Sequence, residues 1–438
     1  MSDATAKKEE RRKLQAIKGT RDILPPETEL WNRAEQTAHD VFSTFGFGEI
    51  RLPIFEPTEL FARAVGGETD IVSKEMYSFE DRDETSISLR PEATASVCRA
   101  YIEQGMQQLP QPVKLYYSGP MFRRERPQKG RYRQFYQIGA EILGGSDAPA
   151  TDAEVIEMLM TYFDKVGLHG ATLYINSIGH NADRCRRGYV AQLRAALEKV
   201  KDQLGPDSQR RIDTNPLRVL DSKLESEQAI IATLPHIADH LCEECKAHYA
   251  AVKRQLELRG VLYEENWRLV RGLDYYMRTT FEITAPGLGS QNAVCGGGRY
   301  DGLVELLGGP PTKGIGFAIG EDRLILSLQE SLPAQAGGKG QPQQGRDVYI
   351  AWMGERAYAA AVHAAKDLRK AGFSVELPPL EQKFGKALGQ ADKLGAKYAL
   401  ILGDNEVSEA LWTLKTLADG TQQKLPEPEL IDYLKRHQ

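Results

Sequence analysis

The stretch VKLYYSGPMFRRERPQKGRYRQFYQIGAEI at residues 113–142 decides the fold of the region around it. Both of its ends alternate apolar and polar side chains, whereas its middle is polar and contains Pro and Gly. This pattern predicts a long antiparallel hairpin with a loop at its tip. Between Arg123 and Arg133 the loop carries six basic residues and one acidic residue, so it is a candidate site for phosphate groups.

The second strand of this hairpin has two different faces, because successive side chains of a strand point to opposite sides. One face is apolar and is expected to be core: Tyr136, Ile138, Ala140 and Ile142. The other face mixes a cation, an aromatic ring, an amide and a carboxylate: Arg133, Phe135, Gln137, Gly139 and Glu141. That combination is typical of a ligand platform, and a solvated sheet face is the alternative.

A second strand signal, GIGFAIGEDRLIL at 314–326, is followed by a helix signal that begins near Glu321. One face of the strand holds only small residues at positions 314, 316, 318 and 320, so a flat group such as a nucleobase could lie against the backbone there. Arg323 falls in the first turn of the helix, where a cation opposes the helix dipole. An anionic ligand would remove that conflict.

Two Gly-, Arg- and Tyr-rich runs, LVRGLDYYMRTTFEI at 269–283 and CGGGRYDGLVELLGG at 295–309, match no phosphate-loop or dinucleotide fingerprint. All of the chain's histidines lie outside these segments, which argues against a catalytic triad or a histidine general base. They are His39, His169, His180, His236, His240, His248, His363 and His437. The group His240, Cys242, Cys245 and His248 suggests zinc, but it lies in a helical pattern, so the sequence favours ordinary helix residues there.

The length of 438 residues is too great for one hydrophobic core and predicts two or three domains. With 41% hydrophobic and 27% charged residues, the composition is that of a globular protein and excludes a largely disordered or coiled-coil chain. No apolar run is long enough for a bilayer and no signal peptide is recognised, so we expect no membrane partner. Five scattered cysteines favour a reducing, cytoplasmic location.

Changes of pattern along the chain predict its domains. Residues 1–13 are charged and are expected to be a mobile tail, and 14–332 alternate strand and helix signals. Within them, about 183–262 show only helical periodicity and are expected to be a helical insertion. A linker is expected at 333–345, rich in Gly, Pro and Gln. Residues 346–438 then alternate strand and helix, which predicts a small α/β domain with a largely parallel sheet.

These segments together resemble the histidyl-tRNA synthetases, a family of class II aminoacyl-tRNA synthetases. FRRE at 122–125 with RYRQFYQIGAE, and GFAIGEDRL at 316–324, are similar to the second and third class II motifs. EIRLPIFEPTELF at 49–61 resembles the first, which forms the dimer interface in the family, while LVRGLDYY and GGGRYDGL resemble motifs peculiar to the histidine enzymes. One departure is GEDRL, where the family more often has an apolar residue and Glu before Arg323.

The resemblance implies an α+β catalytic domain, with an antiparallel sheet, flanking helices and a helical insertion, followed by a small anticodon-binding α/β domain. It also implies ligation of L-histidine to the 3′ end of tRNA(His), with ATP and Mg²⁺, through a histidyl-adenylate and in a homodimer. The carboxylate nucleophile is already an anion at pH 7, so the reaction needs positioning and phosphate neutralisation rather than a base, which suits arginine.

The site residues implied by the resemblance fall into four groups. The catalytic group is Arg123, Arg271 and Arg323. The histidine-binding group is Glu92, Thr94, Arg123, Gln137, Glu141, Arg271, Tyr275, Tyr276 and Tyr300, in which Glu141 and the tyrosines read the imidazole. The ATP-binding group is Arg123, Glu125, Arg131, Phe135 and Arg323, and the candidate acceptor-stem contacts are Gln128 and Arg131.

The alternative is a paralogue of these synthetases, a histidine-binding regulatory subunit of ATP phosphoribosyltransferase that charges no tRNA. Such a protein lacks the C-terminal domain and usually loses parts of the histidine motifs. Both motifs and the segment after 346 are present in this chain, which favours the synthetase. A bare RNA-binding module fits less well, because the net charge of the chain is −5.

Overall fold

The structure is a computed structural model that describes residues 14–67, 69–270, 273, 275–289, 292–331 and 345–437. The predicted tail at 1–13 and nearly all of the predicted linker at 333–345 lie outside the described residues. The chain divides into two compact units, chiefly within residues 14–331 and 345–437. Of the helices that the structure describes, none combines the length and apolar character needed to cross a membrane.

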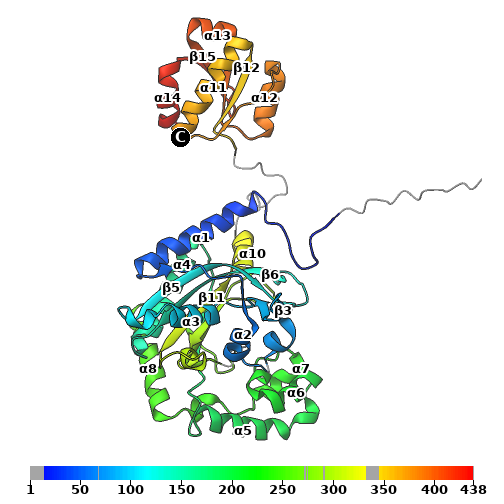
Figure 1. Cartoon of the computed structure of the whole chain (residues 1–438), viewed down its shortest axis with the longest axis vertical. Helices are drawn as coiled ribbons and strands as arrows, with labels where there is room; N and C mark the ends of the chain where they lie inside the picture. Colours follow the sequence, from blue (N-terminus) through cyan, green and yellow to red (C-terminus); the bar gives the residue numbers. More distant parts are fainter. Residues whose placement is uncertain are drawn as a thin grey trace, which may run out of the picture. The chain divides into compact units, whose positions relative to one another are not determined.

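An eight-stranded sheet forms the centre of the larger unit within the described residues (Figure 1). Its order is β1 (Gly48–Glu49), β5 (Val113–Phe122), β6 (Gln134–Leu143), β11 (Gly314–Gly320), β10 (Ala293–Arg299), β9 (Met277–Thr284), β7 (Thr172–Ser177) and β8 (Glu264–Glu265). The pairings from β5 to β7 are all antiparallel, and the short edge strands β1 and β8 pair in parallel. The predicted antiparallel sheet is therefore confirmed, with parallel edges added.

The predicted hairpin is formed by β5 and β6, which pair from Val113 opposite Leu143 to Phe122 opposite Gln134. The apolar face of β6 is buried as expected, because Ile138, Ala140 and Ile142 belong to the main hydrophobic core. That core is closed by α1 (Glu27–Thr44), α4 (Pro149–Val166) and α10 (Glu321–Ser331), which lie on one face of the sheet (Figure 1).

The opposite face of the sheet carries a second core and a small subsidiary sheet. Its helices are α2 (Thr58–Val65), α3 (Thr94–Glu103) and α9 (Leu303–Leu306). The subsidiary sheet has the order β2 (Phe55–Pro57), β4 (Ser86–Leu89), β3 (Tyr77–Glu80). One face of β6 therefore packs into the main core. Its other face is turned towards the second core, beside which the candidate active site lies.

The segment IRLPIF at 50–55, within the stretch that resembles the first class II motif, was expected to be an apolar strand, but the structure breaks it between β1 and β2. The Ile50 N–H still bonds the Tyr116 carbonyl of β5 at 2.8 Å, but residues 50–54 are not part of a strand and β2 begins only at Phe55. Pro53 has no N–H to give to a sheet, and the carbonyls of Leu52 and Pro53 instead accept hydrogen bonds from Arg90 Nη1 at 3.0 and 3.2 Å. Ile54 and Phe55 remain 44% and 58% exposed.

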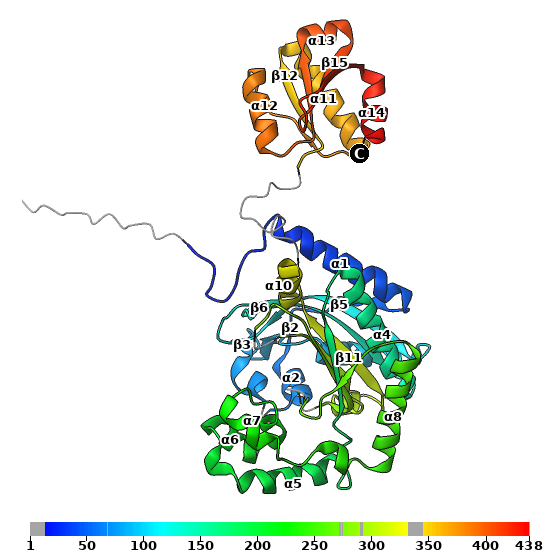
Figure 2. The same cartoon turned by 180° about the vertical axis from the view of Figure 1, so that it is seen from behind.

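Residues 183–262 are helical where the sequence predicts an insertion. They contain α5 (Arg186–Glu198), α6 (Pro206–Thr214), α7 (Glu225–Ile231) and α8 (Glu243–Leu258), with short 3₁₀ turns between them. α5, α6 and α7 lie at the end of the unit away from α10, and their residues form a separate core (Figure 2). α8 differs, because its Val252 and Leu256 pack into the main core beside α4.

The smaller unit has its own sheet, in the order β13 (Val375–Glu376), β12 (Val348–Met353), β14 (Tyr398–Gly403), β15 (Leu411–Thr416), β16 (Gln422–Pro426). Its helices are α11 (Glu355–Lys370), α12 (Phe384–Lys393), α13 (Asp404–Glu409) and α14 (Leu430–Arg436). The first three strands are parallel, but β15 and β16 are antiparallel, so the predicted largely parallel sheet is only half correct. The connection at 404–410 is too short for a parallel crossover.

Candidate active site

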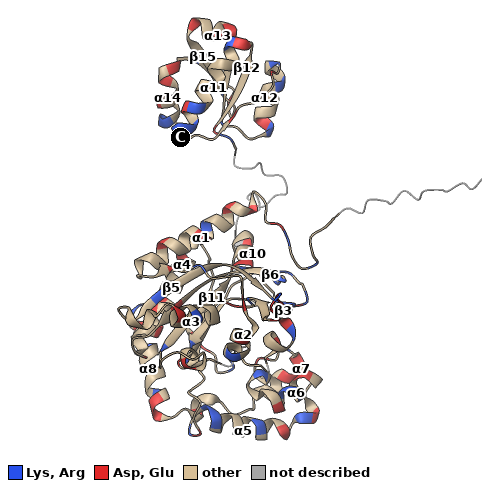
Figure 3. Cartoon of the chain, in the orientation of Figure 1, with Lys and Arg blue, Asp and Glu red and all other residues tan. Residues whose placement is uncertain are grey.

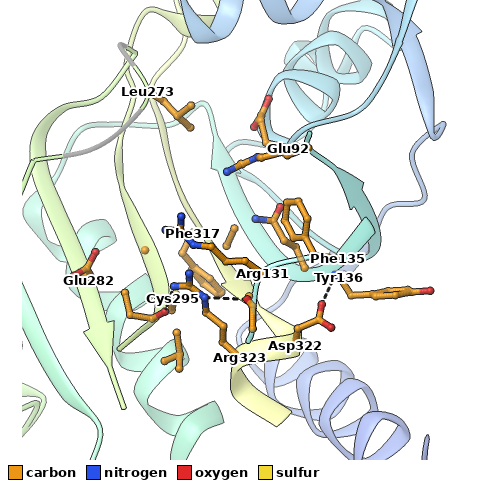
Figure 4. A pocket seen from close by; sticks show the side chains of 18 of the residues that line it. Glu92, Arg131, Phe135, Tyr136, Leu273, Glu282, Cys295, Phe317, Asp322 and Arg323 are labelled. Atoms are coloured by element: carbon orange, nitrogen blue, oxygen red, sulfur yellow. Dashed lines mark hydrogen bonds between the residues drawn. The ribbon is translucent and has the colours of Figure 1, made fainter. Parts of the chain in front are cut away.

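A pocket of about 420 Å³ lies on the face of the sheet opposite the main core, in the size range of small-molecule sites (Figure 4). Its walls come from the β5–β6 hairpin, β9, β10, β11 and the first residues of α3 and α10. The structure brings together in its lining the predicted site residues Glu92, Thr94, Arg123, Glu125, Arg131, Phe135, Gln137, Tyr275, Tyr276 and Arg323. The pocket therefore brings together residues of the four segments that the sequence analysis treats one by one, 113–142, 269–283, 295–309 and 314–326.

The remaining predicted residues are placed differently. Glu141 and Tyr300 are not in the pocket lining but are buried behind it, at 1% and 2% exposure. Gln128 is exposed on the hairpin loop, where its backbone forms a bridge with Arg131. Arg271 lies outside the described residues.

Glu92 is fixed by the start of a helix. Its carboxylate accepts hydrogen bonds from the backbone N–H groups of Thr94 at 2.8 Å and Ala95 at 3.1 Å, at the N-terminus of α3. Burial raises the pKa of Glu92, and these two N–H donors oppose that change. In Figure 4, Glu92 lies across the pocket from Arg323.

Glu141 lies in a buried hydrogen-bonded group. Its two oxygens accept hydrogen bonds from Thr94 Oγ1 at 2.7 Å and from the Tyr300 hydroxyl at 2.5 Å. Burial raises the pKa of Glu141 to about 8, although both hydroxyl donors lower it. Thr94 also lines the pocket, so it connects Glu141 to the cavity.

The small residues of β11 have two different roles, which corrects the prediction of one flat nucleobase platform. Ala318 and Gly320 line the pocket. A methyl group at position 316 would lie 1.7 Å from Glu141 Oε2, and one at position 314 would lie 2.3 Å from the Tyr300 ring. Half of this glycine face therefore makes room for the buried Glu141–Tyr300 pair, and half faces the cavity.

Two polar atoms beside the pocket are buried without a hydrogen-bond partner among the described residues. They are Gln137 Oε1 and the Tyr117 hydroxyl, and both side chains line the cavity. A buried polar group without a partner is unfavourable, so such atoms are suited to a ligand that supplies the missing bond. An amide oxygen accepts hydrogen bonds only, which makes Gln137 Oε1 suited to an N–H or O–H donor.

Three arginines supply positive charge at the other end of the pocket. Arg323 donates from Nε to Gly130 O at 3.3 Å and from Nη1 to Ala293 O at 2.8 Å (Figure 4). Burial lowers the pKa of Arg323, and the nearby charge of Arg131 lowers it further. Arg123 donates to Pro91 O at 2.9 Å, and its guanidinium lies 5.3 Å from the centre of the Phe135 ring.

Glu125 is the acidic member of this group. Its carboxylate accepts a hydrogen bond from Arg131 at 3.2 Å and lies 3.9 Å from Arg123 Nη1. It holds the two arginines at one side of the cavity, where their guanidinium groups can bind phosphate oxygens. Figure 3 shows Lys and Arg gathered on the loop that carries these arginines, at the tip of the hairpin.

The acidic pair before Arg323 acts away from that arginine. Asp322 accepts a hydrogen bond from the Tyr136 backbone N–H at 2.9 Å and another from Arg21 at 3.3 Å. Glu321 is fully buried, and burial raises its pKa well above the ordinary value. Asp322 therefore has a structural role, in which it ties β6 and the N-terminal segment to α10.

Sequence reasoning missed several residues of the pocket. Asp221 and Lys223 reach it from the helical insertion, and Glu282 reaches it from β9, opposite Gly296 of β10. Tyr117 was also missed, although it lies on the predicted hairpin. The parity of β9 offers a signal for Glu282, but no local pattern identifies the two residues from the insertion.

Comparisons with known proteins agree over nearly the whole chain. A family described as "Histidyl-tRNA synthetase" matches residues 19–324, and one described as "Anticodon binding domain" matches 347–437. A histidine–tRNA ligase of Solibacter usitatus is 54% identical, with 95% of this chain and 98% of the relative covered, and that of Koribacter versatilis is 53% identical, with 97% and 96% covered. The crystal structure of apo S. aureus histidyl-tRNA synthetase aligns with a TM-score of 0.78 at 38% identity, over 97% of this chain and 100% of that one.

Proposed function

The chain belongs to the histidyl-tRNA synthetase family, as a class II histidine–tRNA ligase, and we propose that the pocket described above activates histidine with ATP and transfers it to tRNA(His). The observation that carries this proposal is the division of one cavity into a histidine end and a phosphate end. The first has Gln137 and, behind Thr94, the buried Glu141, and the second has three arginines.

At the histidine end, the α-amino group binds Glu92, Thr94 and Gln137. The buried Gln137 Oε1 lacks a partner among the described residues, and an ammonium group would supply one. The imidazole is read by Glu141 with Tyr275, Tyr276 and Tyr300. A ring with one N–H and one lone pair needs an acceptor and a donor, which a carboxyl group and phenol hydroxyls provide.

At the phosphate end, Arg123 and Arg271 hold the α-phosphate and the substrate carboxylate. The carboxylate attacks the α-phosphorus, a bond to the pyrophosphate oxygen breaks, and histidyl-adenylate and pyrophosphate form. Arg323 binds the γ-phosphate and, with Phe135, encloses the adenine, while Glu125 and Arg131 position the nucleotide. Guanidinium groups fixed in advance stabilise the charge that builds on phosphate during the displacement.

ATP is expected to enter as its magnesium complex, in which phosphate oxygens and waters supply most of the metal ligands. Carboxylates are the protein ligands that Mg²⁺ prefers. Glu282 and Glu125 fit this requirement, because both line the pocket on the side of the arginines. They would hold the metal, and the metal would neutralise phosphate charge.

The second step transfers histidine to the terminal adenosine of tRNA(His). We propose that the hairpin loop faces the acceptor stem, with Gln128 and Arg131 as contacts, and that the C-terminal domain binds the anticodon. That domain has 13 basic and 13 acidic residues from 346 to 438, so base and shape contacts are favoured over bulk charge there.

We further propose a cytoplasmic homodimer. The exposed Ile54 and Phe55 in the first class II motif are apolar side chains that a partner subunit would cover. The structure joins none of the five cysteines in a disulfide, which suits a reducing compartment.

Histidine-dependent exchange of pyrophosphate into ATP tests the activation step with the purified full chain. We expect exchange with L-histidine and none with other amino acids. A folded protein that binds histidine but supports no exchange would contradict the proposal and favour the regulatory-subunit alternative. Charging of a tRNA(His) transcript tests the second step, and exchange without charging would remove only the proposed tRNA contacts.

A further inference from the structure

A cluster of sulfur and nitrogen ligands lies outside the pocket, where the helical insertion joins the sheet. Among the described residues, the ligand atoms of His180, Cys185, Cys242 and Cys245 all lie within 4.8 Å of one another. His180 Nδ1 is 3.0 Å from Cys245 Sγ and 3.7 Å from Cys242 Sγ. Cys185 and Cys245 are 1% and 0% exposed, so the cluster is largely closed to solvent.

This set differs from the group that the sequence suggested. Cys242 and Cys245 belong to both sets, but the two neighbouring histidines face elsewhere. The His240 ring packs against Tyr189, and His248 Nε2 lies 3.0 Å from the backbone carbonyl of Asp147. His180 and Cys185 take their places from a segment about 60 residues earlier.

The distances from His180 to two of the cysteine sulfurs are close to those of a tetrahedral metal site. With zinc–sulfur and zinc–nitrogen bonds of about 2.3 and 2.0 Å, tetrahedral geometry places two sulfurs roughly 3.8 Å apart and a sulfur and a nitrogen roughly 3.5 Å apart. The two His180 distances lie on either side of the second value. Three thiolates and an imidazole are the soft ligands that favour zinc over magnesium or calcium.

Local structure holds the ligands in place from two directions. Cys185 immediately precedes α5, whereas Cys242 immediately precedes α8 and Cys245 lies in its first turn. Gly179 has a φ of +62°, and a methyl group there would lie 2.5 Å from Cys185 Sγ. Gly179 also accepts a hydrogen bond through its carbonyl from the Arg278 N–H of β9 at 2.8 Å. Glycine at this position therefore lets the chain pass close to the sulfur cluster.

The charge around the cluster also suits a metal. Three thiolates, one neutral imidazole and Zn²⁺ carry a net charge of −1. Arg278 is 7% exposed, and its positive charge lies close enough to interact with Cys245. Its guanidinium also pairs with Asp147 at 2.8 Å and with Glu244, so the cluster shares this positive charge with two carboxylates.

We propose that His180, Cys185, Cys242 and Cys245 bind one structural zinc ion that fastens the entry and the exit of the helical insertion to each other and to the catalytic sheet. Binding releases the protons of the three thiols, and His180 binds through Nδ1 as a neutral imidazole.

The proposed zinc site is connected to the pocket through residues of the helical insertion. Arg186, next to Cys185, donates a hydrogen bond to the backbone carbonyl of the pocket residue Tyr276. The insertion also carries Asp221 and Lys223, which line the cavity. Loss of zinc should therefore loosen one wall of the pocket without removing any of its arginines.

The test is the metal content of the purified full chain, prepared with zinc and a reducing agent and measured by mass spectrometry of the elements. We expect one zinc per chain, and less than a tenth of that in His180→Ala and in the Cys242→Ser/Cys245→Ser double variant. His240→Ala and Cys98→Ser are matched controls, a half-buried histidine and a buried cysteine outside the cluster, and both should keep the full zinc content.

A second measurement on the unaltered chain protects the test against variants that fail to fold. Replacing zinc with Co²⁺ should produce thiolate-to-cobalt charge-transfer absorption and the visible bands of a tetrahedral site. Zinc below a tenth of an equivalent together with absence of these bands would overturn the proposal. A metal-free chain with a disulfide between two of the three cysteines would also overturn it, in favour of a redox pair.

Discussion

The ionisation of Glu141 makes a sharp prediction about histidine binding. Its pKa of about 8 in the unliganded chain follows mainly from burial, and only the carboxylate is a pure acceptor for the imidazole N–H. With that pKa, roughly half of the sites are ionised at pH 8, about one in ten at pH 7 and about one in a hundred at pH 6. Histidine affinity should therefore rise with pH up to about 8.

The Glu141→Gln variant isolates this effect because it keeps the size of the side chain and removes the titration. A charge-assisted hydrogen bond at a buried site contributes about 1.5–3 kcal/mol, or roughly 10- to 100-fold in affinity. We expect this loss at pH 9 and a loss that shrinks as the pH falls below 8, until the two proteins differ by no more than about twofold at pH 6. Dividing the variant's Kd by that of the unaltered chain cancels the titration of histidine itself, since both proteins bind the same ligand.

Isothermal titration of histidine into both proteins from pH 6 to pH 9 measures this ratio, and the KM values in pyrophosphate exchange give a second estimate. The KM for ATP should be nearly unchanged. A ratio that stays constant over the whole range would refute the carboxylate as the imidazole acceptor. Equal effects on both substrates would remove Glu141 from the histidine site and leave Tyr275, Tyr276 and Tyr300 as the residues that read the ring.

Stability provides an independent check on the same group. A carboxyl group whose folded pKa is raised from 4.5 to about 8 contributes stability that is fully present below pH 4.5 and is lost as pH rises through 8. At pH 9 the loss amounts to as much as about 5 kcal/mol, from roughly 1.4 kcal/mol per pKa unit. Urea unfolding should therefore show Glu141→Gln gaining stability relative to the unaltered chain between pH 5 and pH 9, and parallel pH profiles would contradict the raised pKa.

Four further substitutions test the rest of the site and the proposed subunit interface. Gly316→Ala should raise the KM for histidine at least tenfold, because its methyl group would lie 1.7 Å from Glu141 Oε2. Gly320→Ala should affect only the KM for ATP, because the nearest atoms to its methyl group would be 3.8 Å away. Equal effects of the two variants on the KM for histidine in pyrophosphate exchange would contradict this separation. Arg271→Ala should lower the rate of adenylate formation by roughly 10²–10³ with little change in histidine binding, and a hundredfold weaker binding at unchanged turnover would make Arg271 a substrate anchor. Phe55→Glu, at a side chain 58% exposed, should convert a dimer to a monomer in sedimentation, and a monomeric unaltered chain at micromolar concentration would contradict the proposed interface.

How much of this site the sequence could predict depends on how far apart along the chain the contacting residues lie. Alternation along β6 separated the core residue Ile138 from the pocket residue Gln137, because the two-residue period of a strand is a local property. The same alternation placed Gly316 and Gly320 on one face of β11 but did not show that Glu141 fills the space above Gly316. Side-chain partners across neighbouring strands depend on register, which one sequence does not specify.

Contacts between distant segments were the main omission. Cys242 and Cys245 lie within reach of each other along the chain, whereas His180 and Cys185 join them only because the insertion returns to the place where it left the sheet. Lys223 reaches the pocket for the same reason. In both cases the helical periodicity was interpreted correctly, and the position of the helices relative to the sheet was the missing information.

The rigidity of β6 bears on how the enzyme distinguishes histidine from other amino acids. Gln137 and Glu141 are four residues apart on this strand, which is paired on both sides, with β5 and with β11. A strand held by two neighbours fixes that separation at roughly 13 Å between the two Cα atoms, and Thr94 and Tyr300 hold the carboxyl group at one end. With the amino group assigned to Gln137 and the imidazole to Glu141, as we propose, a substrate must present an ammonium group and a hydrogen-bonding ring at a matching distance, and a shorter or apolar side chain would leave Glu141 without its proposed ligand partner. On this proposal, discrimination would come from the polar bond that the wrong amino acid fails to make, which a pocket selecting by size alone does not provide.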